Sequence, residues 1–144
     1  RLPIVVSRYA HMGAASSYAS RAFMETAKQG SFVFQVRPES RPALIYARDV
    51  IGAVLGLLEA PTEQLQRRVY NIQALSPTAA ELAAVIAARY PGASLTFQTD
   101  PQIADLIDSW PRRFDDSAAR RDWNWRSAYD LDAMASDFVT SLQD

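Results

Sequence analysis

The sequence predicts an α/β fold in which short apolar strands alternate with helices. β-branched runs such as residues 4–6 are typical of strands buried in a parallel sheet. Several of these runs are followed by a segment with helical apolar spacing, bounded by a capping residue, a glycine or a proline. No repeat, low-complexity stretch or linker interrupts the 144 residues, so we expect one compact unit over residues 1–144.

The first half of the chain supplies three of the predicted strands. We expect strands over residues 1–7, 32–36 and 43–46, and helices over residues 18–29 and 50–60. Ser16 or Ser17 is the expected N-cap of the first helix, and Gly30 ends it. Asp49 is the expected cap of the second helix, whose apolar residues occupy nearly every face and therefore predict a well-buried helix.

The second half is richer in helices. We expect strands over residues 69–72 and 95–98, and helices over residues 76–90, 101–109, 115–123 and 131–142. Pro77 and Glu81 mark the start of the first of these helices. Asp115, Asp116 and Asp130 are expected to cap the last two.

Composition excludes several classes of protein. The 15 basic and 16 acidic residues leave no electrostatic footprint for nucleic acid. The absence of cysteine excludes disulfides, thiolate catalysis and Cys-based zinc sites, and a single histidine excludes an imidazole-rich metal centre. No apolar run approaches the roughly 20 residues of a membrane span, and no signal peptide opens the chain. We therefore expect a cytoplasmic protein without metal, membrane or nucleic-acid partners.

Single residues carry little chemistry without further context. His11 has no metal-ligand spacing around it, and the adjacent Asp115 and Asp116 are explained more simply as helix caps than as a catalytic pair. No P-loop, nucleophile elbow or glycine-rich dinucleotide turn is present. Because a buried opening strand normally has neighbours that precede it, we expect the chain to be the second part of something larger.

A resemblance to a known family rests mainly on the carboxy-terminal third. The blocks that carry it are residues 108–111, 114–125 and 129–134, together with residues 67–78 and the Arg1, Pro3 and Ser7 positions. They resemble the L-threonine 3-dehydrogenase type of extended short-chain dehydrogenases, in the NAD-dependent epimerase/dehydratase family. The resemblance implies the carboxy-terminal part of a Rossmann-like fold, with a small mixed α/β substrate-binding lobe.

Two departures from the family pattern bear on function. The loop over residues 13–19 carries Ser17 where the family usually has Asp, and its Ala-Ala-Ser-Ser stretch is also similar to D-erythronate dehydrogenases. The family's glycine turn is absent, and no tyrosine of this chain is followed four residues later by lysine, so the catalytic Tyr-Lys pair is absent as well. The dinucleotide-binding half and every catalytic residue are therefore expected to lie outside this chain.

The resemblance also assigns roles to individual residues. Pro3, Ile4 and Val5 would lie beside the nicotinamide of NAD. Ser7, Ser16, Ser17 and Trp110 would line the pocket of a small hydroxy substrate, and Arg41 is a weaker candidate to bind its carboxylate. The list of expected site residues is Pro3, Ile4, Val5, Ser7, Ser16, Ser17, Arg41 and Trp110.

The resemblance implies oxidation of a secondary hydroxyl, and the first choice of reaction is L-threonine to 2-amino-3-ketobutyrate. It also implies that the intact enzyme forms homodimers. A D-erythronate-type sugar-acid dehydrogenase, a sugar-nucleotide epimerase or dehydratase, and a non-catalytic remnant or binding module remain the alternatives.

Overall fold

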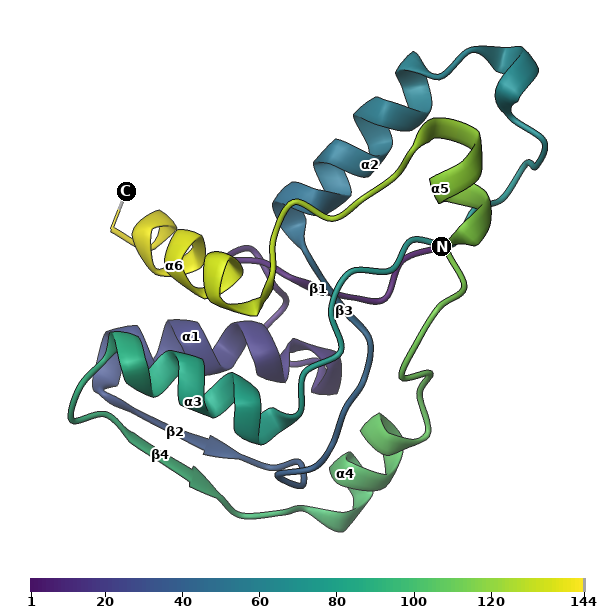
Figure 1. Ribbon diagram of the computed structural model, residues 1–144. Coiled ribbons are helices and arrows are strands. Elements are labelled where there is room, and N and C mark those ends of the chain that lie inside the picture. The colour runs from purple at the N-terminus through teal and green to yellow at the C-terminus, as the bar shows by residue number, and fades with distance from the viewer. Residues whose placement is uncertain (144) are drawn as a thin grey trace.

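The computed structural model describes residues 1–143 and is organised around two short parallel strands (Figure 1). Strand β1 (Ile4–Val6) pairs with β3 (Leu44–Tyr46), with Ile4 opposite Leu44 and Val6 opposite Tyr46. A crossover of nearly 40 residues joins them, as parallel pairing requires. The α/β class and the parallel pairing of the opening strand are confirmed.

A larger layer lies on one side of this pair. Strands β2 (Ser31–Phe34) and β4 (Ser94–Phe97) form a second parallel pair, and helices α1 (Tyr18–Gln29) and α3 (Ala79–Arg89) lie beside it (Figure 1). Helix α6 (Leu131–Ser141) packs on α1 and α3. The remaining elements are α2 (Ala47–Glu59), α4 (Pro101–Asp108), α5 (Ser117–Trp123) and two 3-10 turns, Ala15–Ser17 and Thr62–Gln64.

Strand alternation divides the apolar interior into two clusters. Ile4, Val6 and Leu44 contribute to the main core under α1, α3 and α6. Val5 and Ile45 contribute to a smaller core formed with α2, α5 and Trp125. Because successive side chains of a strand point to opposite faces, the β1–β3 pair lies between the two clusters and joins them.

Several predicted helix ends are confirmed by their cap geometry. Gly30 ends α1 in the left-handed conformation, with φ of 72°, which glycine adopts without a steric penalty. Asp130 caps α6 by accepting from the Ala133 amide. Thr78 and Glu81 form a capping box at α3, which begins three residues later than residue 76.

The prediction for the helix after β3 is wrong in two respects. Helix α2 begins at Ala47, so Asp49 lies inside its first turn and accepts a hydrogen bond from the Ala128 amide (2.7 Å) instead of capping the helix. The helix is also far from well buried, since Asp49 and Ala53 are its buried residues and Leu58 is 76% exposed.

Two smaller predictions also need correction. Residues 69–72 form no regular strand, although the Ile72 amide donates to the Arg1 carbonyl (3.0 Å), so this segment still runs beside the start of the chain. Ser17 occupies the N-cap position of α1, but its hydroxyl makes no capping hydrogen bond. Within residues 1–143 no helix has both the length and the apolar character needed to cross a membrane.

The main core depends on Phe138, which is fully buried and stacks on Phe23 with ring centroids 4.8 Å apart. We expect Phe138→Ala to lower the free energy of unfolding by about 3–5 kcal/mol, because it leaves a cavity between α1 and α6. Urea denaturation of the two proteins measures the difference. The control is Leu106→Ala at a half-exposed site on α4, and a loss below about 1 kcal/mol for Phe138→Ala would contradict the assignment of this core.

Candidate functional site

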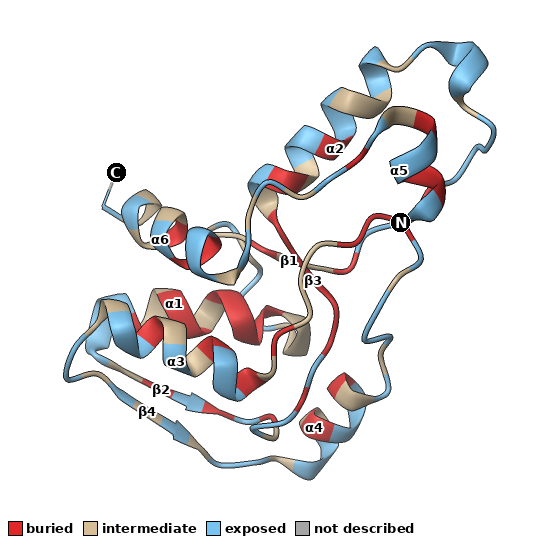
Figure 2. Ribbon diagram, viewed as in Figure 1, coloured by how far each residue is buried: buried red, intermediate tan, exposed pale blue. Residues whose placement is uncertain are grey.

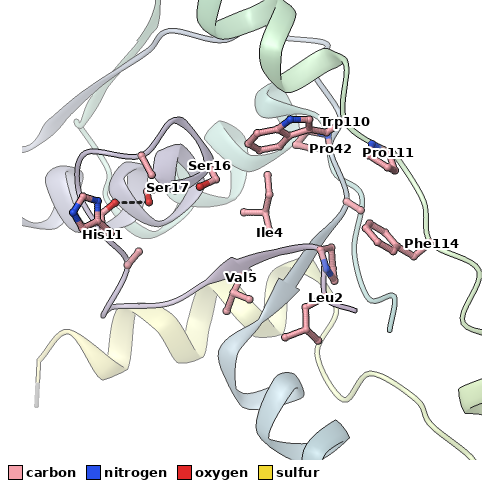
Figure 3. A pocket seen from close by; sticks show the side chains of 14 residues that line it. Leu2, Ile4, Val5, His11, Ser16, Ser17, Pro42, Trp110, Pro111 and Phe114 are labelled. Carbon is pink, nitrogen blue, oxygen red and sulfur yellow. Dashed lines mark hydrogen bonds between the residues drawn. The ribbon is translucent and has the colours of Figure 1, made fainter. Parts of the chain in front are cut away.

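A cavity of about 510 Å³ opens beside the start of β1 (Figure 3). Its walls come from the strand entrance, from the loop that precedes α1, and from the segments around residues 42 and 110–114. They consist of Leu2, Pro3, Ile4, Val5, Ala10, His11, Ala14, Ser16, Ser17, Pro42, Ala43, Trp110, Pro111 and Phe114. Six of the eight residues expected at the site therefore meet here.

Backbone hydrogen bonds hold two of these walls together. The Ile4 amide donates to the Ala43 carbonyl (3.2 Å), and the Ala43 amide donates to the Pro111 carbonyl (3.1 Å). These bonds connect β1, the entrance to β3 and the turn after α4 in one row. Trp110, the residue before Pro111, is consequently held on the cavity wall together with Ile4 and Ser16 (Figure 3).

The loop wall offers two serines with different surroundings. Ser17 is buried, and its hydroxyl donates to the His11 carbonyl, which fastens the loop over residues 11–17 (Figure 3). The Gly13 amide donates to Nδ1 of His11 (3.3 Å) and tightens the same turn. Ser16 is half-buried on this wall. The two serines therefore have different roles: the Ser17 hydroxyl is used in a hydrogen bond within the loop, whereas Ser16 lies on the cavity wall.

Ser7 and Arg41 lie outside the set that lines the cavity. The Ser7 hydroxyl accepts from the Tyr9 amide (3.1 Å), while the Ser7 amide donates to the Ser20 hydroxyl (3.0 Å), so this residue joins the end of β1 to α1. Arg41 forms an ion pair with Glu81 (3.2 Å) on the surface. The structure therefore does not bring these two residues to the cavity.

Eight lining residues were not expected from the sequence, among them His11, Pro42 and Phe114. Phe114 lies in a block that resembles the dehydrogenases, which is a signal that could have found it. Pro42 is brought in by the pairing of Ala43 with its neighbours, and no local pattern indicates that. Figure 3 shows the His11 ring at the far end of the loop, beyond Ser17.

No side chain of Asp, Glu, Lys or Arg lines the cavity. Apart from His11, none of its lining side chains is ionisable. Across residues 1–143, no group of three or more His, Asp or Glu side chains is arranged to hold a metal ion. This wall can therefore hold apolar and hydroxyl-bearing groups, but it has no cluster of cations for a diphosphate.

Four of the six tyrosines have pKa values that are raised in this chain. Burial raises the pKa of Tyr46 to about 12, assisted by the hydrogen bond from its hydroxyl to Asp137 (2.7 Å). Burial also raises the pKa values of Tyr18, Tyr70 and Tyr90. A tyrosine that acts as a general base near neutral pH needs a lowered pKa, so the shifts of these four tyrosines are in the wrong direction for that role.

Comparison with known proteins gives matches along the whole chain. It is 37% identical over 137 residues to the mitochondrial L-threonine 3-dehydrogenase of Bos taurus, covering 94% of this chain and 37% of the relative. It is 28% identical over 146 residues to an uncharacterised epimerase/dehydratase of Staphylococcus haemolyticus, covering all of this chain and 46% of that protein. No protein-family model matches the sequence.

Solved structures show the same relationship in three dimensions. The L-threonine dehydrogenase of Phytophthora infestans matches with a TM-score of 0.91 and 35% identity, covering 99% of this chain and 47% of that one. The chain thus spans less than half the length of each of these relatives. It has the α/β fold of the extended short-chain dehydrogenases, and in sequence and structure it resembles their L-threonine 3-dehydrogenase type.

Proposed function

We propose that this chain is the substrate-binding part of an NAD-dependent dehydrogenase that oxidises a secondary hydroxyl group, with L-threonine as the first candidate. The product would be 2-amino-3-ketobutyrate. The observation that carries the proposal is the cavity at the start of β1, with its apolar strand, its hydroxyl-bearing loop and its facing tryptophan. It occurs in a chain that resembles L-threonine 3-dehydrogenases along its length.

The residues expected to meet the cofactor fit a nicotinamide. Pro3, Ile4 and Val5 line the cavity with apolar side chains and backbone, which suits an uncharged carboxamide beside a flat ring. NAD, when bound, supplies the hydride acceptor for the reaction. The lack of a cation cluster in the lining agrees with the diphosphate of the cofactor being held by another part of the enzyme.

We expect this chain to contribute orientation of the substrate. Ser16 would donate to or accept from a polar group of the substrate, and the apolar ring of Trp110 would cover it on the cavity wall. Ser17 would act indirectly by fastening the loop that carries Ser16. The proton of the substrate hydroxyl would go to a tyrosine outside this chain, because no tyrosine of this chain is followed four residues later by the lysine of the family's catalytic pair.

One alternative has support from the loop itself. Ala14, Ala15, Ser16 and Ser17 are similar to the corresponding stretch of D-erythronate dehydrogenases, so a sugar acid is the second candidate substrate. A sugar nucleotide is disfavoured, because the cavity presents no arginine or lysine to a diphosphate. Cytoplasmic location and a homodimeric intact enzyme stay predictions, and the bovine relative is named as mitochondrial.

The first test uses a polypeptide in which a dinucleotide-binding part with the glycine turn and the Tyr-x-x-x-Lys pair precedes Arg1. We expect NAD reduction at 340 nm with L-threonine, and weaker or no reduction with D-erythronate. Activity on erythronate alone would contradict the first candidate substrate. A protein that oxidises neither compound nor any other hydroxy acid would support the non-catalytic alternative.

The second test separates Ser16 from Arg41 in the same active polypeptide. We expect Ser16→Ala to lower kcat/KM by about 10- to 100-fold, which corresponds to roughly 1.4–2.8 kcal/mol of transition-state stabilisation. Arg41→Ala should leave kcat/KM within about twofold, since Arg41 is paired with Glu81 outside the cavity. The reverse pattern would assign the substrate carboxylate to Arg41.

The third test concerns the loop. Ser17→Ala removes the donor to the His11 carbonyl, and we expect the free energy of unfolding to fall by about 1 kcal/mol. Ser16→Ala, at the adjacent position, should leave it unchanged. Equal stability of the two variants in urea denaturation would contradict the anchoring role of Ser17.

A further inference from the structure

A second hollow lies between helix α2 and residues 123–129, and we call it the α2 hollow. Figure 1 shows the segment that follows α5 running beside α2 toward α6. The α2 hollow has a volume of about 340 Å³, which is within the roughly 300–1,000 Å³ of small-molecule sites. It shares no lining residue with the cavity beside β1. The two are therefore separate features of the chain.

Two glycines leave the wall of α2 bare at this point. Gly52 and Gly56 are one turn apart inside the helix and both line the hollow, although glycine is less favourable in a helix interior than every residue except proline. Packing explains Gly56, because a Cβ there would lie 3.2 Å from Cδ1 of Trp123. A Cβ at Gly52 would meet no neighbouring atom within 4 Å, so close packing does not explain that glycine. Its effect is to keep the hollow open.

A buried carboxylate belongs to the same wall. Asp49 and Ala53 are the buried residues of α2 and lie in its first half (Figure 2). Asp49 is 3% exposed and lines the hollow. Its Oδ1 accepts from the Ala128 amide (2.7 Å), whereas Oδ2 is buried and has no hydrogen-bond partner within residues 1–143. Burial raises the pKa of Asp49, although the hydrogen bond from Ala128 acts in the opposite direction. A positively charged donor would stabilise such a carboxylate.

The other wall offers donors that the protein itself does not use. Nε1 of Trp123 is buried and has no hydrogen-bond partner among the described residues. Arg126 is exposed, lines the hollow and forms no ion pair within residues 1–143. Arg48 also lines the hollow, but it is paired with Asp137 (2.8 Å). Arg126 is therefore the guanidinium that is available for an anionic group.

We infer that the α2 hollow binds a free α-amino acid with an apolar side chain. The ammonium group of the ligand would donate to Oδ2 of Asp49, and its carboxylate would accept from Arg126 and from Nε1 of Trp123. These groups belong to one site because the amide of Ala128, two residues after Arg126, is bonded to Asp49. An α-amino acid carries its two charges on neighbouring groups, which suits a cation site and an anion site that adjoin.

The space over Gly52 would receive the side chain of the ligand. The bare helix surface there, with the rings of Trp123 and Tyr129 in the same lining, forms an apolar wall. The inference goes beyond the proposed function, because the α2 hollow takes no part in the reaction.

Other occupants fit the lining less well. A ligand that is only a cation would leave Arg126 and Nε1 of Trp123 without partners, and one that is only an anion would meet the carboxylate of Asp49. Water is the competing occupant, because one ordered water would satisfy Oδ2 of Asp49. Water alone explains neither the bare surface at Gly52 nor the unpaired Arg126.

The test measures the binding of L-leucine to the 144-residue chain by NMR. The chain has three tryptophans, so their indole N–H signals can be assigned with single tryptophan-to-phenylalanine variants. We expect millimolar L-leucine to shift the Trp123 signal saturably and to leave the signal of Trp110, which lines the other cavity, in place. No saturable shift of Trp123 would overturn the inference. Because this binding needs neither NAD nor a catalytic residue, that result would leave the proposed reaction standing.

Two analogues separate the charged groups of the ligand. Isocaproate lacks the ammonium group of leucine, and isoamylamine lacks its carboxylate. We expect each to bind about tenfold more weakly than L-leucine or worse. Equal affinity for either analogue would overturn the assignment of an amino acid.

Matched variants locate the site. Gly52→Leu fills the hollow and favours the helix, so we expect it to abolish binding without loss of stability. Arg126→Gln should weaken binding about tenfold, whereas Arg68→Gln, at another exposed arginine outside the hollow, should leave it unchanged. Binding that survives Gly52→Leu, or that falls equally in the two arginine variants, would contradict the inference.

Asp49→Asn separates charge from structure. Asparagine keeps an acceptor for the Ala128 amide and loses the negative charge. We expect it to weaken L-leucine about tenfold and to leave the affinity for isocaproate unchanged. An equal fall for both compounds would show that Asp49 only holds the segment at Ala128, and would overturn its role in binding an ammonium group.

Discussion

The structure depends on the register of two three-residue strands. With Ile4 opposite Leu44 and Val5 opposite Ile45, alternate side chains of β1 and β3 enter two different apolar clusters. A shift of one residue would exchange the faces and place each side chain in the wrong cluster. The same register sets the Ile4-to-Ala43 hydrogen bond, and through Ala43 the position of Pro111 and the adjacent Trp110. The cavity is therefore a consequence of strand pairing.

A second set of contacts ties the smaller core to the start of the chain. The Tyr70 hydroxyl donates to the buried Asp122 carboxylate (2.7 Å), and this bond, together with donors from Gln66 and Arg121, keeps the pKa of Asp122 below its ordinary value despite burial. The Tyr70 carbonyl accepts from the Arg1 nitrogen. Residues 66–72 thus fasten α5 against the entrance of β1.

Local signals predicted most of the elements correctly. Gly30, Asp130 and the apolar runs act within a few residues, so the sequence alone is enough to locate α1, α6 and β1. Longer-range contacts explain the failures. Asp49 has the sequence position of a helix N-cap, but its carboxylate accepts a hydrogen bond from the amide of Ala128, 79 positions away. Residues 69–72 look like a strand, but their hydrogen bonds go to Arg1 and to Asp122 through Tyr70.

The candidate site shows the same division. Resemblance to the dehydrogenases indicated eight site residues. The structure brings six of them into a single cavity, namely Pro3, Ile4, Val5, Ser16, Ser17 and Trp110. Ser7 turns instead toward Ser20 and Tyr9, and Arg41 toward Glu81. Neither could be foreseen, because each depends on a helix that packs beside the strand. The sequence also failed to predict the exposed face of α2 for a related reason. An apolar helix pattern predicts burial, and which faces are covered depends on the elements that pack beside the helix.

We propose above all that cofactor and substrate meet in the cavity beside β1. A crystal structure of the active, longer polypeptide with NAD and L-threonine bound tests this most directly. We expect the nicotinamide against Pro3, Ile4 and Val5, with the substrate between Ser16 and Trp110. A substrate bound elsewhere, with this cavity filled by side chains or solvent, would contradict it.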